Sequence, residues 1–131
     1  MRRLIDNALA NNTPCLVATA SRAGQPSIGP KGSVMAFDGE HLAYWERVRR
    51  GLLADVAENP LVCIYYGDRA ARVFWRFYGT ATVHKTGEVR DAIMARTVQA
   101  EMDRDPQRLG YGVLVRVDKI VNLAGQVMQE R

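Results

Sequence analysis

Short apolar segments bounded by turn residues dominate the chain. Cys15–Ala20 and residues 61–66 are mostly apolar, and residues 113–117 carry closely spaced bulky side chains, which favours strands with at least one buried face. In residues 71–84, apolar side chains recur at alternate positions over a longer stretch, which Gly79 interrupts. A glycine within a strand pattern predicts a β-bulge, so we expect this strand to bend around a curved sheet.

Turn signals connect these strands by short links. Gly24 and Pro26 follow the first strand, and Asp38-Gly39 precedes a strand expected at residues 41–45. Such residues are typical of β-hairpins. Tight hairpins join antiparallel strands, whereas parallel strands need a long crossover. The pattern therefore argues against a doubly wound α/β fold.

The segment between the two turns contains both strand-forming and strand-breaking residues. We expect a strand that begins at residues 27–28, breaks at residues 29–32 and resumes at residues 33–37, because glycine and proline interrupt pairing within a sheet. Met35 and Phe37 are expected to face the interior.

Three segments show the helical spacing of apolar residues. They cover residues 4–12, 48–59 and about 87–103. Pro14 forbids continuation of the first segment, and Thr86 is the expected N-cap of the third. The expected order therefore contains three helices and six strands.

The amino-acid composition is typical of a globular protein, and we expect residues 1–131 to form a single domain. The chain is 47% hydrophobic and 24% charged, and its hairpin-linked strands place it in the all-β or α+β class as a curled barrel. No run reaches the roughly 20 apolar residues of a membrane span, and the first residues lack a signal-peptide pattern. Cys15 and Cys63 are expected to be free buried thiols. We expect a cytoplasmic location.

Charge and motif searches narrow the chemistry. The formal charge is +4 and the pI is near 9.4, which favours an anionic partner such as a phosphate ligand or a nucleic acid. His41 and His84 have no partner at metal-ligand spacing, which argues against zinc. The sequence contains no G-x-S-x-G, G-x-G-x-x-G or P-loop motif. Neither an α/β-hydrolase triad nor a Rossmann site is therefore indicated.

Two basic segments flank the Asp38-Gly39 hairpin. One is Gly29-Pro30-Lys31-Gly32-Ser33, and the other runs through residues 47–50 into the second expected helix. A phosphate group binds to free backbone N–H groups and to cations, which helix N-termini, arginine and lysine supply. Pairing about the hairpin would place both segments at one cleft. Each segment alone also fits a surface turn or a solvated helix face.

Four stretches of sequence carry a resemblance. They are residues 14–20 with Gly24-Gln25-Pro26, residues 42–45 leading through Leu52-Leu53 to Asn59-Pro60, residues 77–83, and residues 115–120. Their order resembles that of the pyridoxamine 5'-phosphate oxidase-like, FMN-binding split-barrel superfamily across residues 4–123. The resemblance implies a six-stranded antiparallel Greek-key split β-barrel with flanking helices.

The resemblance also implies a homodimer that binds FMN at the subunit interface and acts as an oxidoreductase on an unidentified small molecule. Carried over by position, the cofactor-binding residues are Lys31, Gly32, Ser33, Val34, Tyr44, Trp45, Arg47, Arg49, Arg50 and Trp75. Arg49 and Arg50 match the family's phosphate-binding pair, although Arg47 or Val48 replaces the usual hydroxyl residue before it. Trp75 either approaches the partner's flavin or packs in the core.

Alternatives within and outside this family stay open. The same fold could hold deazaflavin F420 or haem, and a small basic barrel could be an OB-like nucleic-acid-binding module. The aromatic residues form no evident basic-aromatic ladder, which argues against nucleic acid. For the FMN site, we expect Lys31→Ala to weaken binding roughly tenfold with little change in thermal stability. The sequence names no catalytic residue, and no metal site or membrane partner is expected.

Overall fold

The computed structural model describes residues 1–48 and 50–131. Within them, eight strands and four helices follow in the order α1 (Arg2–Asp6), β1 (Cys15–Ala20), β2 (Pro26–Lys31), β3 (Met35–Ala36), β4 (His41–Glu46), α2 (Leu52–Glu58), β5 (Leu61–Asp68), β6 (Val73–His84), α3 (Glu88–Arg96), α4 (Gln99–Met102), β7 (Tyr111–Asn122) and β8 (Val127–Glu130). Two of these strands exceed the six expected, because the segment after the first hairpin divides into β2 and β3 and because β8 folds back on β7.

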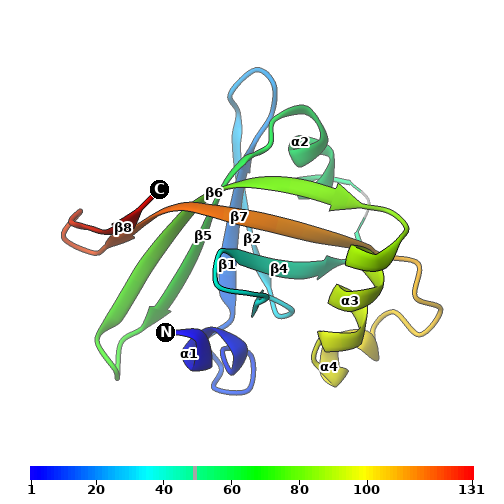
Figure 1. Cartoon of the computed structure of the whole chain (residues 1–131), viewed down its shortest axis with the longest axis horizontal. Coiled ribbons are helices and arrows are strands. Elements are labelled where there is room, and N and C mark those ends of the chain that lie inside the picture. The colour runs from blue at the N-terminus through cyan, green and yellow to red at the C-terminus, as the bar shows by residue number, and fades with distance from the viewer. Residues whose placement is uncertain (49) are drawn as a thin grey trace.

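The strands form one antiparallel sheet that curls into a split barrel (Figure 1). Their order is β2-β1-β5-β6-β7-β4-β3, and β8 pairs with β7. The two strands at the ends of this order, β2 and β3, follow each other in the chain. Residues 32–34 therefore span the seam where the two edges of the sheet meet. The fold class expected from the sequence is confirmed.

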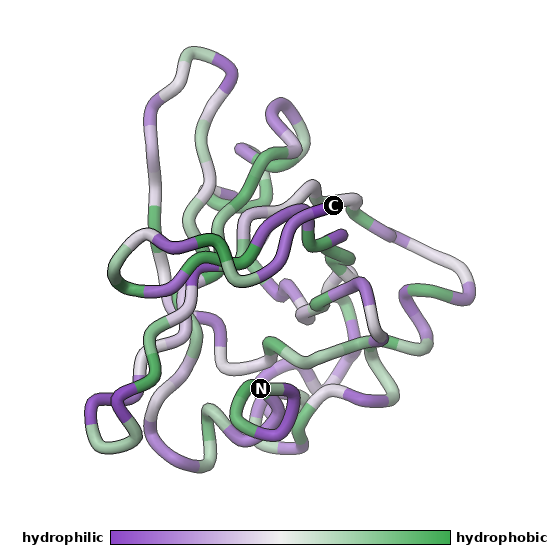
Figure 2. Tube along the Cα trace, turned by 60° about the vertical axis from the view of Figure 1, so that its left-hand side comes forward, coloured by the Kyte–Doolittle hydropathy of each residue, from purple (hydrophilic) through white to green (hydrophobic). Residues whose placement is uncertain are grey.

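The barrel encloses the main hydrophobic core. Alternate side chains of its strands point inward, and Val17, Ile64, Val113 and Val115 are fully buried, as the two-residue period of a strand requires. Figure 2 shows hydrophobic positions gathered along the strands and hydrophilic positions on either side of the apex of the β1–β2 hairpin. The alternation read from the sequence therefore identifies the core.

A second, smaller cluster lies on the other face of β4. Met35, Ala43 and Trp45 pack there against Ile93 of α3 and Met102 of α4, and Phe37 packs at its margin. The expectation that Met35 and Phe37 fill the barrel interior is wrong. Met35 is paired with Ala43, and directly paired residues share a face of the sheet, so both point toward the helices.

The helices cover different parts of the barrel. In Figure 1, α1 lies at one end, α2 at the other, and α3 with α4 at the side near the end of β4. The hydroxyl of Thr19 donates to Asp55 at 2.9 Å and so ties α2 to β1. The carboxylate of Asp6 accepts from the backbone N–H of Ala36 at 2.8 Å and ties α1 to β3.

Two of the expected strand boundaries shift. β2 continues through Gly29 and Pro30 to Lys31, and the break falls at residues 32–34 instead. Pro30 is tolerated because β2 is an edge strand, which can lack an N–H donor without losing a pairing on its open side. The bulge expected at Gly79 is confirmed, since the β6–β7 register shifts between Tyr78 and Gly79.

The expected helices also shorten. The first ends at Asp6, and the second starts at Leu52. The third divides into α3 and α4 because Thr97 has an extended backbone (φ −68°, ψ 137°), as suits a β-branched residue of low helix propensity. Gly87, with φ 100° and no side-chain cap, precedes α3, so Thr86 is not the N-cap.

Candidate functional site

A buried ion pair joins β2 to β4 beside the seam. The Nζ atom of Lys31 lies 2.6 Å from Oε2 of Glu46, and the two side chains are 16% and 2% exposed. Burial raises the pKa of Glu46, while the hydrogen bond and charge of Lys31, and then the charge of Arg47, oppose that rise. The pair fixes the end of β2 against the point where β4 leads into residues 47–50.

Ser33 fastens the seam to the end of β4. Its hydroxyl accepts from the backbone N–H of Trp45 and donates to the carbonyl of Trp45, both at 3.0 Å. The carboxylate of Glu101 from α4 lies against Gly32, and a side chain at this position would displace it. Glu101 in turn faces Arg47, with Oε2 and Nε 3.8 Å apart.

A cavity of about 360 Å³ opens along β3. Its lining residues are Asp6, Ser33, Val34, Met35, Arg96 and Val98. Arg96 of α3 donates to the carbonyl of Phe37 at 2.7 Å and to that of Ala36 at 3.1 Å. The carboxylate of Asp6 accepts from the backbone N–H of Ala36. Together these hydrogen bonds satisfy the backbone groups on the edge of β3 that does not pair with β4. The cavity wall also includes Ser33 and Val34, which follow Lys31 and Gly32 in the chain.

The structure brings together most of the residues expected at the site. Lys31, Gly32 and Arg47 surround Glu46 and Glu101, while Ser33 and Val34 line the adjoining cavity. Arg50 is exposed just beyond Arg47. Arg49 lies outside the described residues.

Tyr44, Trp45 and Trp75 point elsewhere. The side chain of Tyr44 is buried in the barrel core, and burial raises its pKa above the usual value of 10, with a smaller effect from the charge of Glu46. Trp45 contributes backbone groups, but its indole faces α3 and donates to Asp105 at 2.9 Å. Trp75 stacks on Tyr66 at 5.6 Å, and β1 and β5 separate it from β2. Within one chain, Trp75 packs against the core.

Four charged residues of the site were missed by the sequence analysis: Asp6, Glu46, Arg96 and Glu101. Of these four, only Glu46 could have been found from the sequence. It stands two positions after Tyr44 and four after Leu42, so the alternation of a strand places its side chain on the inner face of the sheet. The other three come from α1, α3 and α4, whose positions against the sheet are set by tertiary packing.

The cationic side chains at the seam are of the chemical type that binds a phosphate group such as that of FMN. Lys31, Arg47 and Arg50 supply cations, and a cavity of about 360 Å³ falls within the usual range for bound cofactors, about 300 to 1,000 Å³. Glu46 and Glu101 already pair with two of these cations. The site therefore accepts an anion only with a change in these ion pairs.

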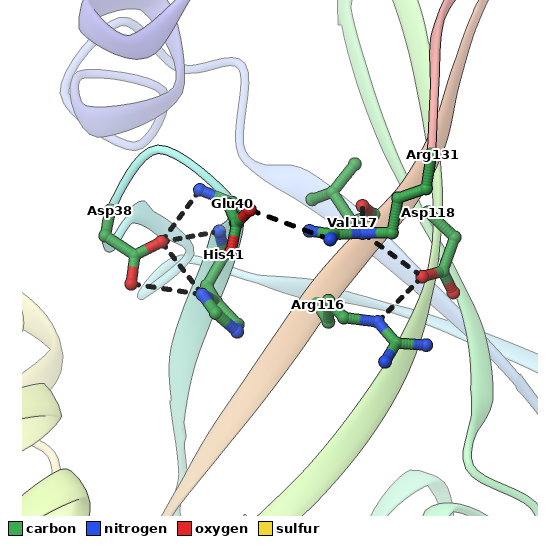
Figure 3. Close-up of polar contacts among 7 residues, drawn as sticks. All are labelled: Asp38, Glu40, His41, Arg116, Val117, Asp118 and Arg131. Atoms are coloured by element: carbon green, nitrogen blue, oxygen red, sulfur yellow. Dashed lines mark hydrogen bonds and ion pairs between the residues drawn. The ribbon is translucent and has the colours of Figure 1, made fainter.

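A second cavity, of about 400 Å³, lies near the opposite end of β4. Its floor includes Ile5, Leu42, Phe77 and Ile120, and its rim carries the charged network drawn in Figure 3.

In that network, Asp118 accepts from Arg116 at 2.9 Å, and Arg131 faces both Asp118 and Glu40. Asp38 pairs with His41 at 2.8 Å. Because Lys31, Ser33 and Arg47 lie at the seam and not at this second cavity, we place the candidate phosphate site at the seam.

Cys15 is a buried free thiol and Cys63 a half-buried one. No helix formed by the described residues is long and apolar enough to cross a membrane. Across residues 1–48 and 50–131, no three His, Cys, Asp or Glu side chains gather as metal ligands.

Comparisons with known proteins agree with this geometry. HupZ of Group A Streptococcus is 28% identical, with a TM-score of 0.77 over 98% of this chain and 96% of that one. A putative pyridoxamine 5'-phosphate oxidase from Lactobacillus delbrueckii is 22% identical, with a TM-score of 0.72 over 92% of each chain. An FMN-binding protein from Syntrophomonas wolfei shares the fold at 17% identity, with a TM-score of 0.75 over 93% of this chain and 83% of that one.

Sequence comparisons give the family directly. No curated protein sequence matches the chain. The family model described as pyridoxamine 5'-phosphate oxidase, however, matches residues 1–118, which include the barrel strands β1 to β6 and the seam. The protein therefore belongs to the pyridoxamine 5'-phosphate oxidase family.

Proposed function

We propose that this protein binds FMN and uses it as an oxidoreductase acting on a small molecule. The observation that carries the proposal is the position of the cations Lys31 and Arg47 at the seam, where Ser33, two residues after Lys31, lines a cavity. A flavin mononucleotide has an anionic end and a flat ring, and this arrangement offers cations next to a cavity. Similarity to a solved FMN-binding protein supports the fold on which the proposal rests.

The roles of the residues follow from their chemistry. Lys31, Arg47 and Arg50 would hold the phosphate by charge-assisted hydrogen bonds. Ser33, Val34 and Met35 would border the ring, and the contacts of Asp6 and Arg96 with β3 keep that border in place. Bound flavin would supply the electron-transfer chemistry, while the protein supplies binding and orientation. No general acid or base is assigned.

We also propose that the active form is a homodimer with the cofactor site at its interface. The support is an apolar row on the outer face of the sheet, where Ile28, Ala18, Cys63 and Tyr78 are paired across four strands. Ile28 is 65% exposed, and Leu61, on the same face, is 64% exposed. A second copy of the chain would cover this face, as apolar patches at homodimer interfaces are covered.

The test begins with the cofactor itself. The absorbance spectrum of the purified protein, and mass spectrometry of any released ligand, should identify FMN. Release of F420 or haem would contradict the proposal. If the protein is purified without a ligand, fluorescence titration should give a tighter dissociation constant for FMN than for riboflavin, which lacks the phosphate.

Variants then test the site. Replacing Arg47 and Arg50 together with alanine should weaken FMN by about tenfold or more, since a hydrogen bond to a charged group contributes about 1.5 to 3 kcal/mol. Riboflavin binding should change little. The matched control replaces Arg22 and Arg69, which are exposed on turns away from the seam, and should leave both ligands unaffected. Equal losses for FMN and riboflavin would show that the two arginines do not hold the phosphate.

A further inference from the structure

Glu46 is an unusual group to find beside a phosphate site. Its side chain is 2% exposed, and only one of its two carboxylate oxygens is bonded. Oε2 faces Lys31 at 2.6 Å, while Oε1 is buried and has no hydrogen-bond partner among the described residues. A buried carboxylate in this state depends on a single cation for its charged form.

Lys31 is the accessible member of the pair. Its side chain is 16% exposed, whereas that of Glu46 is almost fully enclosed. A ligand phosphate at the protein surface can therefore reach Lys31 without reaching Glu46. An ammonium group has three donors but one positive charge, so a phosphate dianion and Glu46 compete for the same charge.

In the part of the chain that the structure describes, the other charged and titratable groups near Glu46 have contacts of their own. Tyr111 of β7 is paired with Glu46 across the sheet, and Nζ of Lys85 lies 5.8 Å from the centre of its ring. Arg47 lowers the pKa of Glu46 less than Lys31 does and faces Glu101 of α4. Tyr44 of β4 is neutral, because burial and then the charge of Glu46 raise its pKa above the usual value of 10. Asp105, near the start of β7, is itself an anion held by Leu109, Trp45 and Gly110. Arg90 of α3 lies over the indole of Trp45.

We propose that a ligand phosphate takes Lys31 from Glu46 and that Glu46 then binds one proton from solvent. This inference rests on the proposed function, since FMN is the phosphate ligand considered. The balance is simple: one ligand binds, one proton is taken up, and no covalent bond other than the carboxyl O–H forms. Glu46 thereby becomes the residue that sets the pH dependence of cofactor binding.

The energetic reason is the cost of a lone buried charge. Removing one partner of a buried ion pair leaves the other uncompensated, and such a group neutralises by changing its protonation state. Protonation of Glu46 is already favoured by its burial. Because one proton is taken up with each ligand, the dissociation constant for FMN should fall about tenfold for each unit of pH decrease in the range where the phosphate is dianionic.

Titration calorimetry tests the proton uptake directly. FMN and riboflavin are titrated into the intact protein at pH 8, where a phosphate monoester of pKa near 6 is dianionic, in two buffers with different heats of ionisation. The difference in apparent binding heat gives the number of protons exchanged. We expect about one proton taken up with FMN and none with riboflavin.

Two matched carboxylate variants assign the proton. Glu46→Gln should abolish the proton uptake and tighten FMN about tenfold at pH 8, because an amide does not compete for the charge of Lys31. Glu101→Gln, which alters the partner of Arg47, should leave the uptake at about one proton.

Failure of the inference differs from failure of the proposed function. FMN binding by the unaltered protein without proton uptake overturns the inference, as does unchanged uptake in Glu46→Gln. Absence of binding by both FMN and riboflavin would instead contradict the proposed function. If Glu46→Gln does not fold, the number of protons taken up by the unaltered protein on binding FMN still tests the inference.

Discussion

Single polar side chains hold the end of β4 in place. Asp105 accepts from the indole of Trp45 at 2.9 Å and from the backbone N–H groups of Leu109 and Gly110 at 3.0 and 2.9 Å. Burial alone would raise the pKa of Asp105, but these hydrogen bonds and the charge of Arg90 lower it below its usual value of 3.8. Asp105 therefore stabilises the fold in its charged form.

Asp105→Asn should lower the free energy of unfolding by about 1 to 3 kcal/mol near neutral pH, because a hydrogen-bonded acceptor is lost. A carboxyl whose pKa is lower in the folded state stabilises above its unfolded-state pKa and loses that effect as pH falls. The urea midpoint of Asp105→Asn should thus lie below that of the unaltered protein by the same amount at pH 7 and at pH 5, and this difference should become smaller below about pH 4. Asp103→Asn, at an exposed position, is the control and should change little.

The Lys31–Glu46 pair changes what is expected of Lys31. Lys31→Met should destabilise the fold by about 3 kcal/mol, because it strands a buried carboxylate, and Lys31→Met with Glu46→Gln should recover much of that loss. In Lys31→Met, the pKa of Glu46 is higher in the folded state than in the unfolded state. Such a carboxyl lowers the free energy of unfolding more as the pH rises above its unfolded-state pKa, so Lys31→Met should become more stable as the pH is lowered from 8 to 5. Chemical denaturation of the three proteins tests this; equal losses in the single and double variants would contradict it.

These residues show what the sequence predicts at this scale. Lys31, Ser33 and Arg47 were found from their segments, because turns and basic clusters are local features. From the sequence alone, Lys31→Ala is expected to leave stability almost unchanged, because the ion-pair partner of Lys31 lies 15 positions along the chain and across the seam, where no local pattern reveals it. Arg96 and Asp6 could not be assigned, because their contacts depend on how α3 and α1 pack.

At the scale of elements, the bulge in β6 determines how the barrel bends. The register between β6 and β7 shifts at Gly79, where a Cβ atom would lie 2.5 Å from the carbonyl oxygen of Arg116 and 2.6 Å from Cγ1 of Val115. A backbone carbonyl within a sheet cannot move aside cheaply. Glycine therefore permits the close approach of the two longest strands.

Gly79→Ala should lower the free energy of unfolding by about 2 kcal/mol, within the range for overpacked sites. Gly39→Ala is the matched control, because a Cβ atom there would meet nothing within 4 Å, and it should change stability by less than about 0.5 kcal/mol. Thermal or urea unfolding of both variants provides the comparison. Similar stabilities for the two would mean that the sheet adjusts to a side chain at the bulge.

Strands were predicted more closely than helices. The expected β1 matches the structure residue for residue, and Gly79 correctly indicated the bulge, because alternation and glycine act within a few residues. The long expected helix divides at Thr97, and α1 ends early. Short helices depend on tertiary packing more than on propensity, so local spacing fixes their presence but not their limits.

At the scale of the whole molecule, the outer face of the barrel leads to a test of the dimer. Ile28 and Leu61 are about two-thirds exposed on the face where Ala18, Cys63 and Tyr78 are paired across neighbouring strands. Light scattering should give about twice the chain mass of 14.6 kDa. Ile28→Lys with Leu61→Lys should reduce this to one chain mass, because charges are costly in a covered interface.

Monomerisation should also weaken FMN binding, since the proposed site lies at the interface and the partner would complete it. The control pair, Leu123→Lys with Val127→Lys, changes residues that are 68% and 52% exposed but lie at the β7–β8 turn, away from that face. It should remain dimeric and bind FMN normally. A monomeric charged variant with unaltered FMN affinity would show that one chain forms the whole site, and a monomeric unaltered protein would remove the shared-site arrangement altogether.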